Sequence, residues 1–175
     1  MLEKGDSGKE SILTKIGLQR SYNVACTTAD TSLQADSGVI LRQTIEEQNL
    51  QYFRKGFADA KQMTLSFYAK TTKTGTYVCE LYDYDNFRGV SQTFSVTTAW
   101  TRVELSFPAD TTGAMDNDNA VSLDLRWYLG AGSNATGGTQ ATTWESFTAA
   151  NAIPSNHVNL ADSTSNDWAI TGVQL

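Results

Sequence analysis

Residues 62–85 read QMTLSFYAKTTKTGTYVCELYDYD, and this segment decides the fold of the chain. Apolar side chains occupy every second position on both sides of Gly75, first Met63, Leu65 and Phe67 and then Cys79 and Leu81. Alternation with a period of two is typical of a strand that buries one face. The segment therefore predicts a hairpin of two antiparallel strands, whose other face meets water and carries Tyr68, Glu80 and Tyr82.

The same alternation continues on both sides of this segment. It predicts a long first strand from Ile16 to Cys26 and further strands over 39–46, 90–97, 100–107, 121–129 and 167–175. Residues 47–61 break the pattern, and we expect this connection to be anchored in the core by Leu50, Tyr52, Phe53 and Phe57. About eight short strands without a long helical period favour an all-β fold, an antiparallel two-sheet β-sandwich of the jelly-roll type.

The domain organisation is expected to be simple. Residues 1–14 have little to bury and are interpreted as an N-terminal arm, and 15–175 as a single β-sandwich domain. A long insert over 130–165, which contains Trp144 and Pro154, exceeds ordinary loop length and predicts a binding loop or a contact arm.

Charge and composition exclude several kinds of partner. The formal net charge is -6 and the pI is about 4.7, so no basic surface is expected to attract nucleic acid. The first ten residues are charged and contain no apolar run, so neither a secretory signal nor membrane insertion is predicted.

Few residues offer catalytic or metal chemistry. Cys26 and Cys79 fall in predicted strands, where a lone cysteine is usually a small buried hydrophobe, so free thiols are favoured over a disulfide. His157 is the only histidine and no Cys-x-x-Cys or Gly-x-Ser-x-Gly occurs, so no zinc site, cofactor or serine triad is predicted. Glu80 and Asp124 would need apolar surroundings to act as a glycosidase pair, and an exposed strand face does not provide them. We therefore expect no enzyme.

The polar phase of three strands provides the main candidate site. Its members are aromatic or hydrogen-bonding residues: Tyr68, Glu80, Tyr82, Asp124, Arg126 and Tyr128. On one shared sheet, such residues would bind a glycan, because sugar rings stack on aromatic faces while charged groups bond the hydroxyls. Two other readings stay open, namely ordinary cross-strand pairs facing water and a contact with a neighbouring subunit.

Other candidates lie outside that face. Trp144 offers a sugar platform or an anchor into another protein, although a loop tryptophan also commonly caps its own core. We expect Trp100, Trp127 and Trp168 in the core. Asp116 and Asp118, in the run Asp-Asn-Asp-Asn, offer oxygen ligands to calcium, but they lack the spacing of an EF-hand, and a solvated turn is the favoured interpretation.

Several blocks in a fixed order resemble a known family. They are Thr64-Leu-Ser-Phe-Tyr-Ala-Lys70, Thr74-Gly-Thr-Tyr-Val78, Thr98-Ala-Trp-Thr-Arg102, Asp110-Thr-Thr-Gly113, residues 158–166 and Trp168-Ala-Ile-Thr-Gly-Val-Gln-Leu175. From about Leu18 to Leu175 the chain resembles the β-sandwich module of tail fibres and other virion surface proteins of tailed bacteriophages, notably marine and cyanobacterial phages. It is also similar in outline to jelly-roll carbohydrate-binding modules. The family commonly has Trp-Gly where this chain has Arg54-Lys-Gly-Phe57, so no role of that tryptophan carries over.

The resemblance implies a function. It implies a non-enzymatic structural protein on the virion surface, a tail-fibre or capsid-decoration subunit made in the host cytoplasm. Its expected partners are other virion proteins and copies of itself, as a homotrimer, with a host surface glycan as a further partner. The alternative is a carbohydrate-binding module that acts with a larger glycan-active protein. The family often continues with Glu-Val-Gly beyond the last strand, so the sequence reads either as a short self-contained protein or as a piece of a longer one.

Overall fold

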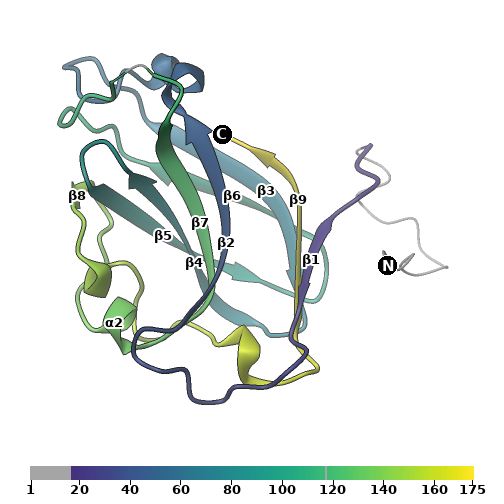
Figure 1. The fold of residues 1–175 in the computed structure, drawn as a ribbon. Helices are drawn as coiled ribbons and strands as arrows, with labels where there is room; N and C mark the ends of the chain where they lie inside the picture. Colours follow the sequence, from purple (N-terminus) through teal and green to yellow (C-terminus); the bar gives the residue numbers. More distant parts are fainter. Residues whose placement is uncertain (1–16, 117) are drawn as a thin grey trace.

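The computed structural model describes residues 17–116 and 118–175, so the arm expected over 1–14 lies outside the described residues. Within them, nine strands form two antiparallel sheets that stack face to face (Figure 1). One sheet has four strands in the order β1-β9-β3-β6, and the other has five in the order β2-β7-β4-β5-β8. The predicted all-β two-sheet sandwich is therefore confirmed.

The elements have the following bounds. The four-stranded sheet contains β1 (Tyr22–Ala25), β3 (Met63–Thr71), β6 (Thr101–Phe107) and β9 (Asp167–Gln174). The five-stranded sheet contains β2 (Gly38–Glu46), β4 (Gly75–Asp83), β5 (Arg88–Val96), β7 (Val121–Ala131) and β8 (Glu145–Ser146). Short helical turns are η1 (Glu47–Asn49), η2 (Gln51–Phe53), α2 (Ser133–Thr136), η3 (Ala149–Asn151) and η4 (Leu160–Asp162). Among the described residues, no helix is both long enough and apolar enough to cross a bilayer.

The core lies between the sheets, where the alternating apolar side chains meet. Fully buried residues from both sheets belong to a single cluster that includes Leu65, Leu81, Leu123 and Leu125. The ring of Phe67 packs edge-on against Trp127 from the opposite sheet, with 5.7 Å between ring centroids. The predicted apolar phase of each of these strands is therefore the phase that faces the core.

The predicted hairpin over 62–85 is wrong, although both of its strands exist. β3 and β4 belong to different sheets, because the connection through Gly75 crosses from one layer to the other. Gly75 has φ of 145°, and a Cβ added there would lie 2.3 Å from Val158 Cγ1, so this crossing requires glycine. Alternation identifies which side chains point inward, but it does not identify the neighbouring strand.

Two further expectations about the core need correction. The first strand is short, only Tyr22–Ala25, and Tyr22 is exposed. In the connection after β2, Leu50 is buried and Phe53 packs on the core as predicted, whereas Tyr52 and Phe57 are exposed. Trp127 and Trp168 are buried as expected, but Trp100 lies partly exposed beneath the Lys70 ammonium.

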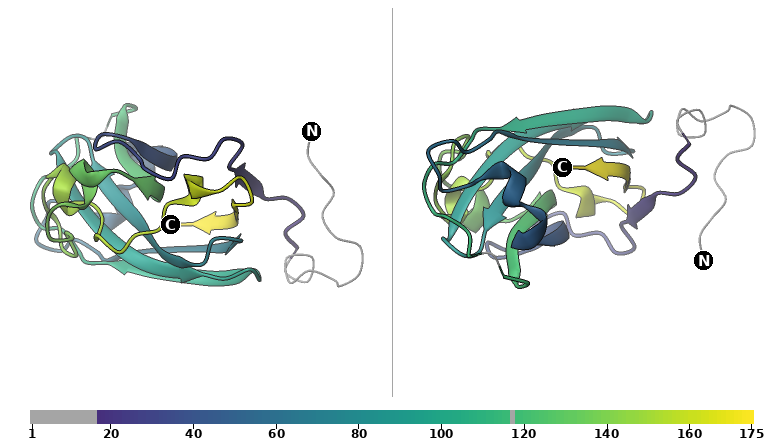
Figure 2. Two further views of the ribbon diagram at one scale, coloured as in Figure 1. Left: turned by 90° about the horizontal axis from the view of Figure 1, so that it is seen from below. Right: turned by 90° about the horizontal axis from the view of Figure 1, so that it is seen from above.

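The long insert packs on its own domain. Its turns α2 and η3 lie on the side of the sandwich away from β1 (Figures 1 and 2). Its turn η4 lies near the chain after β1, where the Asp30 N–H donates to the Ala161 carbonyl at 2.7 Å. β8 pairs with β5, and Ala152 and Ile153 are buried against Val78 and Tyr128 on the outer face of the five-stranded sheet. As a result, the central strands of that sheet are covered on both faces, which explains why residues 77–83 are all buried.

Candidate functional site

The face predicted to bind glycan is partly assembled. Glu80 pairs in register with Arg126, and Tyr82 with Asp124, so four predicted residues lie together on β4 and β7. Tyr128 joins them through its hydroxyl, which donates to Glu80 Oε2 at 2.9 Å. Tyr68 does not belong to this group, because it lies on β3 in the other sheet.

The expectation that this face meets water is wrong. Glu80, Tyr82, Asp124 and Tyr128 are all buried. The insert packs on Tyr82 and Tyr128, and Arg42 and Tyr84 lie against Asp124. Phe147 of the insert packs edge-on against Tyr82, with 4.8 Å between ring centroids. The five polar residues therefore form a closed group beneath the insert.

The polar atoms of this closed group bond mainly to one another. The Arg126 guanidinium lies 3.3 Å from Glu80 Oε2 and 3.1 Å from Asp124 Oδ2, and its Cζ is 3.9 Å from the centre of the Tyr82 ring. Burial raises the pKa of Glu80 even though Arg126 opposes this shift. Burial lowers the pKa of Arg126, but Glu80 and neighbouring hydrogen bonds raise it more, so the guanidinium stays charged. This arrangement is that of a buried ion pair.

Only the rim of the closed group reaches the surface. Arg42 on β2 is about half exposed and its Nε lies 2.6 Å from Asp124 Oδ2, while the Tyr84 hydroxyl donates to the same oxygen at 2.8 Å. Sequence reasoning missed Arg42 and Tyr84. Their positions on the polar phase beside Asp124 and Arg126 were the available signal.

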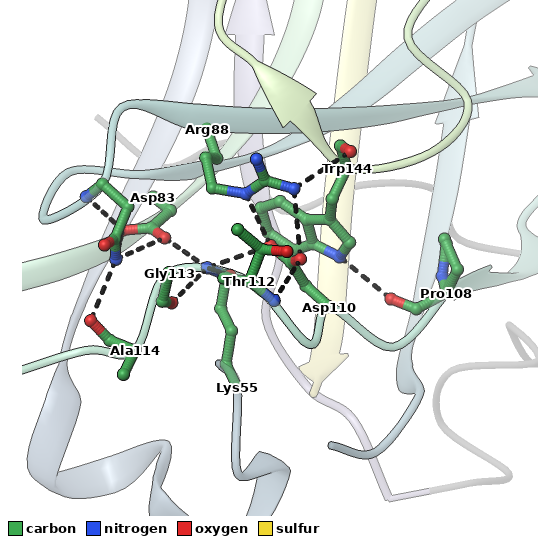
Figure 3. A network of polar contacts seen from close by, with 10 residues as sticks. Lys55, Asp83, Arg88, Pro108, Asp110, Thr112, Gly113, Ala114 and Trp144 are labelled. Atoms are coloured by element: carbon green, nitrogen blue, oxygen red, sulfur yellow. Dashed lines mark hydrogen bonds and ion pairs between the residues drawn. The ribbon is translucent and has the colours of Figure 1, made fainter. Parts of the chain in front are cut away.

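A second polar network lies at one end of the sandwich (Figure 3). The Lys55 ammonium is buried and donates to the Asp83 carboxylate, lies 3.1 Å from Asp110 Oδ2, and donates to the Gly113 carbonyl at 2.9 Å. Arg88 holds the other side of Asp110 through two hydrogen bonds of 2.8 and 3.1 Å. Two cations and two carboxylates therefore compensate one another.

This network joins four separate segments of the chain. Arg88 also donates to the Trp144 carbonyl, while the Trp144 indole N–H donates to the Pro108 carbonyl at 2.9 Å (Figure 3). Burial raises the pKa of Asp110, but hydrogen bonds from Arg88, the Thr112 N–H and Lys55 lower it further, so the net pKa lies below its ordinary value. Trp144 is buried in the core of its own domain. This position agrees with a tryptophan that caps the core and excludes an exposed sugar platform. We call this part of the molecule, comprising 47–61, 83–88 and 108–116, the Lys55 end.

The Lys55 end presents aromatic side chains to solvent. Tyr52 is 88% exposed, Phe87 68% and Phe57 51%. Phe87 and Arg54 are the described non-glycine residues with positive φ, at 51° and 49°. Such backbone conformations are costly for ordinary residues and persist where the surrounding structure fixes them. The buried network lies next to both positions, since Lys55 follows Arg54 and Arg88 follows Phe87.

Phe57 also lines a hollow of about 240 Å³, together with residues that include Glu47, Leu50 and Met115. We call it the acidic hollow. Glu47 is buried, and its Oε2 has no hydrogen-bond partner. Burial raises the pKa of Glu47, and the carboxylates of Asp116, Asp85 and Asp118 raise it further.

The calcium expectation for Asp116 and Asp118 gains no support from this geometry. Both side chains are exposed, and Asp118 Oδ1 accepts from the Ala120 N–H as in a solvated turn. In the described part of the chain, no three His, Cys, Asp or Glu side chains are arranged to hold a metal ion.

The remaining reactive residues are buried or half-buried. His157 Nε2 lies 2.9 Å from the Tyr128 carbonyl, and burial lowers the pKa of the imidazole. Both cysteines are free thiols, with Cys79 buried and Cys26 half-buried.

No protein-family model, no curated protein and no solved structure matches this chain. The fold and the sites together define an all-β sandwich with one closed polar face and one exposed aromatic end.

Proposed function

We propose that this chain is a non-catalytic structural protein of a bacteriophage virion surface, in a tail fibre or a capsid decoration, and that it contacts neighbouring proteins through its Lys55 end. The observation that carries the contact role is the exposure of Tyr52, Phe57 and Phe87 around one rigid end. Aromatic residues are enriched at protein interfaces. The order of the sequence blocks supports the virion setting.

A rigid base makes these rings suitable for a contact. The segments that carry the rings are fixed by ion pairs among Lys55, Asp83, Asp110 and Arg88. Binding therefore costs little conformational entropy in the backbone of these segments. The closed polar face contributes in another way, because its charges are compensated internally and its Tyr82 ring packs against Phe147 of the insert.

An open sheet edge supports a homo-oligomer, for which we propose a trimer. Among the described residues, β2 pairs only with β7, which leaves its other edge free along nine residues. Beside it, Tyr22, Leu41, Trp127 and Ile170 help to line a hollow of about 380 Å³ between β1, β2 and β9. Free edges and apolar hollows are features that subunit contacts cover.

The alternative is a carbohydrate-binding module, and the same three exposed rings favour it, because sugars stack on aromatic faces. The two functions are separated by light scattering and a glycan array on the purified protein. A stable trimer with a blank array supports the structural role. A monomer with a positive array, lost in Tyr52→Ala, supports the carbohydrate-binding module instead.

The virion setting has its own test. An antibody against the purified protein is applied to phage particles from the source of the sequence, with immunogold detection. Label on tail fibres or capsids supports the proposal, and particles without label, from a lysate in which the protein is detected, overturn it.

A further inference from the structure

Glu47 lines the acidic hollow, and one of its carboxylate oxygens has no hydrogen-bond partner among the residues that the structure describes. Glu47 is only 9% exposed, and its Oε2 has no hydrogen-bond partner. Asp85 nearby has a second such oxygen, Oδ2. Buried polar atoms are almost always partnered, so an unpartnered carboxylate oxygen beside a hollow indicates a group that is supplied from outside.

The surroundings of Glu47 select a cationic group. Asp85, Asp116 and Asp118 lie close enough to raise the pKa of Glu47. None of these four carboxylates has an ion-pair partner in 17–116 and 118–175. The two cations that line the hollow are already paired, Lys55 with Asp83 and Asp110, and Arg54 with Asp59. Glu47 and the three aspartates near it therefore carry negative charge that no described cation compensates by an ion pair.

The apolar part of the lining restricts the ligand further. Leu50, Phe57 and Met115 provide contact surface for a hydrocarbon stem, and Phe57 provides an aromatic face for a cation. A bare divalent ion would instead need several converging oxygens, which the described acidic side chains do not provide. A charged head on an apolar stem matches both parts of the hollow.

We propose that the acidic hollow receives a lysine or arginine side chain of a partner protein, with its cationic head on Glu47 and its stem against Phe57 and Met115. This inference rests on the proposed role in protein contacts and specifies the chemistry of the partner. Of the three exposed rings, Phe57 lines the hollow itself and would help to exclude water from the charged anchor.

The position of Glu47 in the free protein is consistent with a role in binding. A carboxylate that only stabilised the fold would have a donor within the protein, as Asp110 has in Arg88 and Lys55. Glu47 Oε2 has none among the described residues, so its burial costs stability that binding of a cation would recover.

The test is an NMR titration of ¹⁵N-labelled full-length protein with three probes at matched ionic strength. The probes are the peptide acetyl-Gly-Lys-Gly-amide, the same peptide with norleucine in place of lysine, and calcium chloride. We expect the lysine peptide to shift the amide signals of 47–57 and 114–116, with an affinity at least fivefold above that of the norleucine peptide. Glu47→Gln should remove this preference, while Glu46→Gln, the same charge change at an exposed neighbour, should retain it.

Three results would overturn the inference. They are equal shifts from both peptides, an unchanged lysine preference in Glu47→Gln, or saturation by calcium without a response to the lysine peptide. Circular dichroism of Glu47→Gln establishes that this variant is folded. Failure here leaves the particle labelling and the oligomer measurement unaffected, so the chemistry of the hollow and the proposed function are tested separately.

Discussion

The Lys55 ammonium lies 3.1 Å from the Asp110 carboxylate in the interior of the protein, and the two residues come from different connections of the sandwich. Arg88 completes the group from the start of β5. Because the positive and negative charges balance, each charge depends on the others for its compensation in the interior.

Removing one member should therefore destabilise the protein strongly. We expect Lys55→Met to lower the free energy of unfolding by about 3–5 kcal/mol, because Asp83 loses its cation while buried. Urea denaturation followed by circular dichroism measures this change. The matched control is Lys73→Met, which breaks a partly exposed pair with Asp162 and should cost about 1 kcal/mol or less. Equal losses in the two variants would contradict the compensating role of Lys55.

Replacing Phe87 in its strained turn should increase the stability of the protein. Phe87 has φ of 51° and an exposed ring, so it makes little contact that offsets the strain. Since asparagine tolerates this conformation better, Phe87→Asn should raise the free energy of unfolding by about 0.5–1 kcal/mol. Phe57→Asn, at another exposed ring without positive φ, should show no such gain in the same denaturation experiment. A loss of stability in Phe87→Asn would show that the ring packs on the fold.

The raised pKa of Glu47 predicts that the wild-type protein and Glu47→Gln differ in stability, and that this difference depends on pH. Its folded pKa is raised above the ordinary value of 4.5, so the native state takes up the proton at a higher pH than the unfolded chain does. The ionised carboxylate therefore costs stability at pH 7, and this cost disappears as the pH falls through the raised pKa toward 4.5. Glu47→Gln should raise the free energy of unfolding at pH 7 by up to about 1 kcal/mol. Melting curves of both proteins at pH 7 and pH 4 should show the gain only at pH 7, and a loss at pH 7 would identify Glu47 as a stabilising residue.

The two thiols should differ in reactivity. Burial raises the pKa of the Cys79 thiol well above its ordinary value, whereas Cys26 is half-buried near the surface strand β1. Because the thiolate is the reactive form, a thiol reagent such as DTNB should titrate one cysteine in the native protein and two in guanidinium chloride. Cys26→Ser should remove the native signal, and Cys79→Ser should leave it unchanged.

The sequence indicated which residues form much of the candidate site, but it did not indicate that they are buried. Glu80, Tyr82, Asp124, Arg126 and Tyr128 were expected on one face because they share the polar phase of their strands, and β4 and β7 do pair. Their burial was not predictable from that phase, because Phe147 and Ile153, which pack on Tyr82 and Tyr128, belong to a distant insert. Lys55 was missed for the same reason, since its ion-pair and hydrogen-bond partners lie in two other segments and local periodicity carries no information about them.

Local alternation in the sequence determined which side chains face the core, because a pleated strand directs successive residues to opposite sides and burial of apolar surface selects the side. Tertiary structure alone decided which strands became neighbours, that β3 and β4 part at Gly75, and that the insert closes over a polar face. These outcomes depend on contacts between residues far apart in the chain, because the shape and charge of one segment must complement those of another.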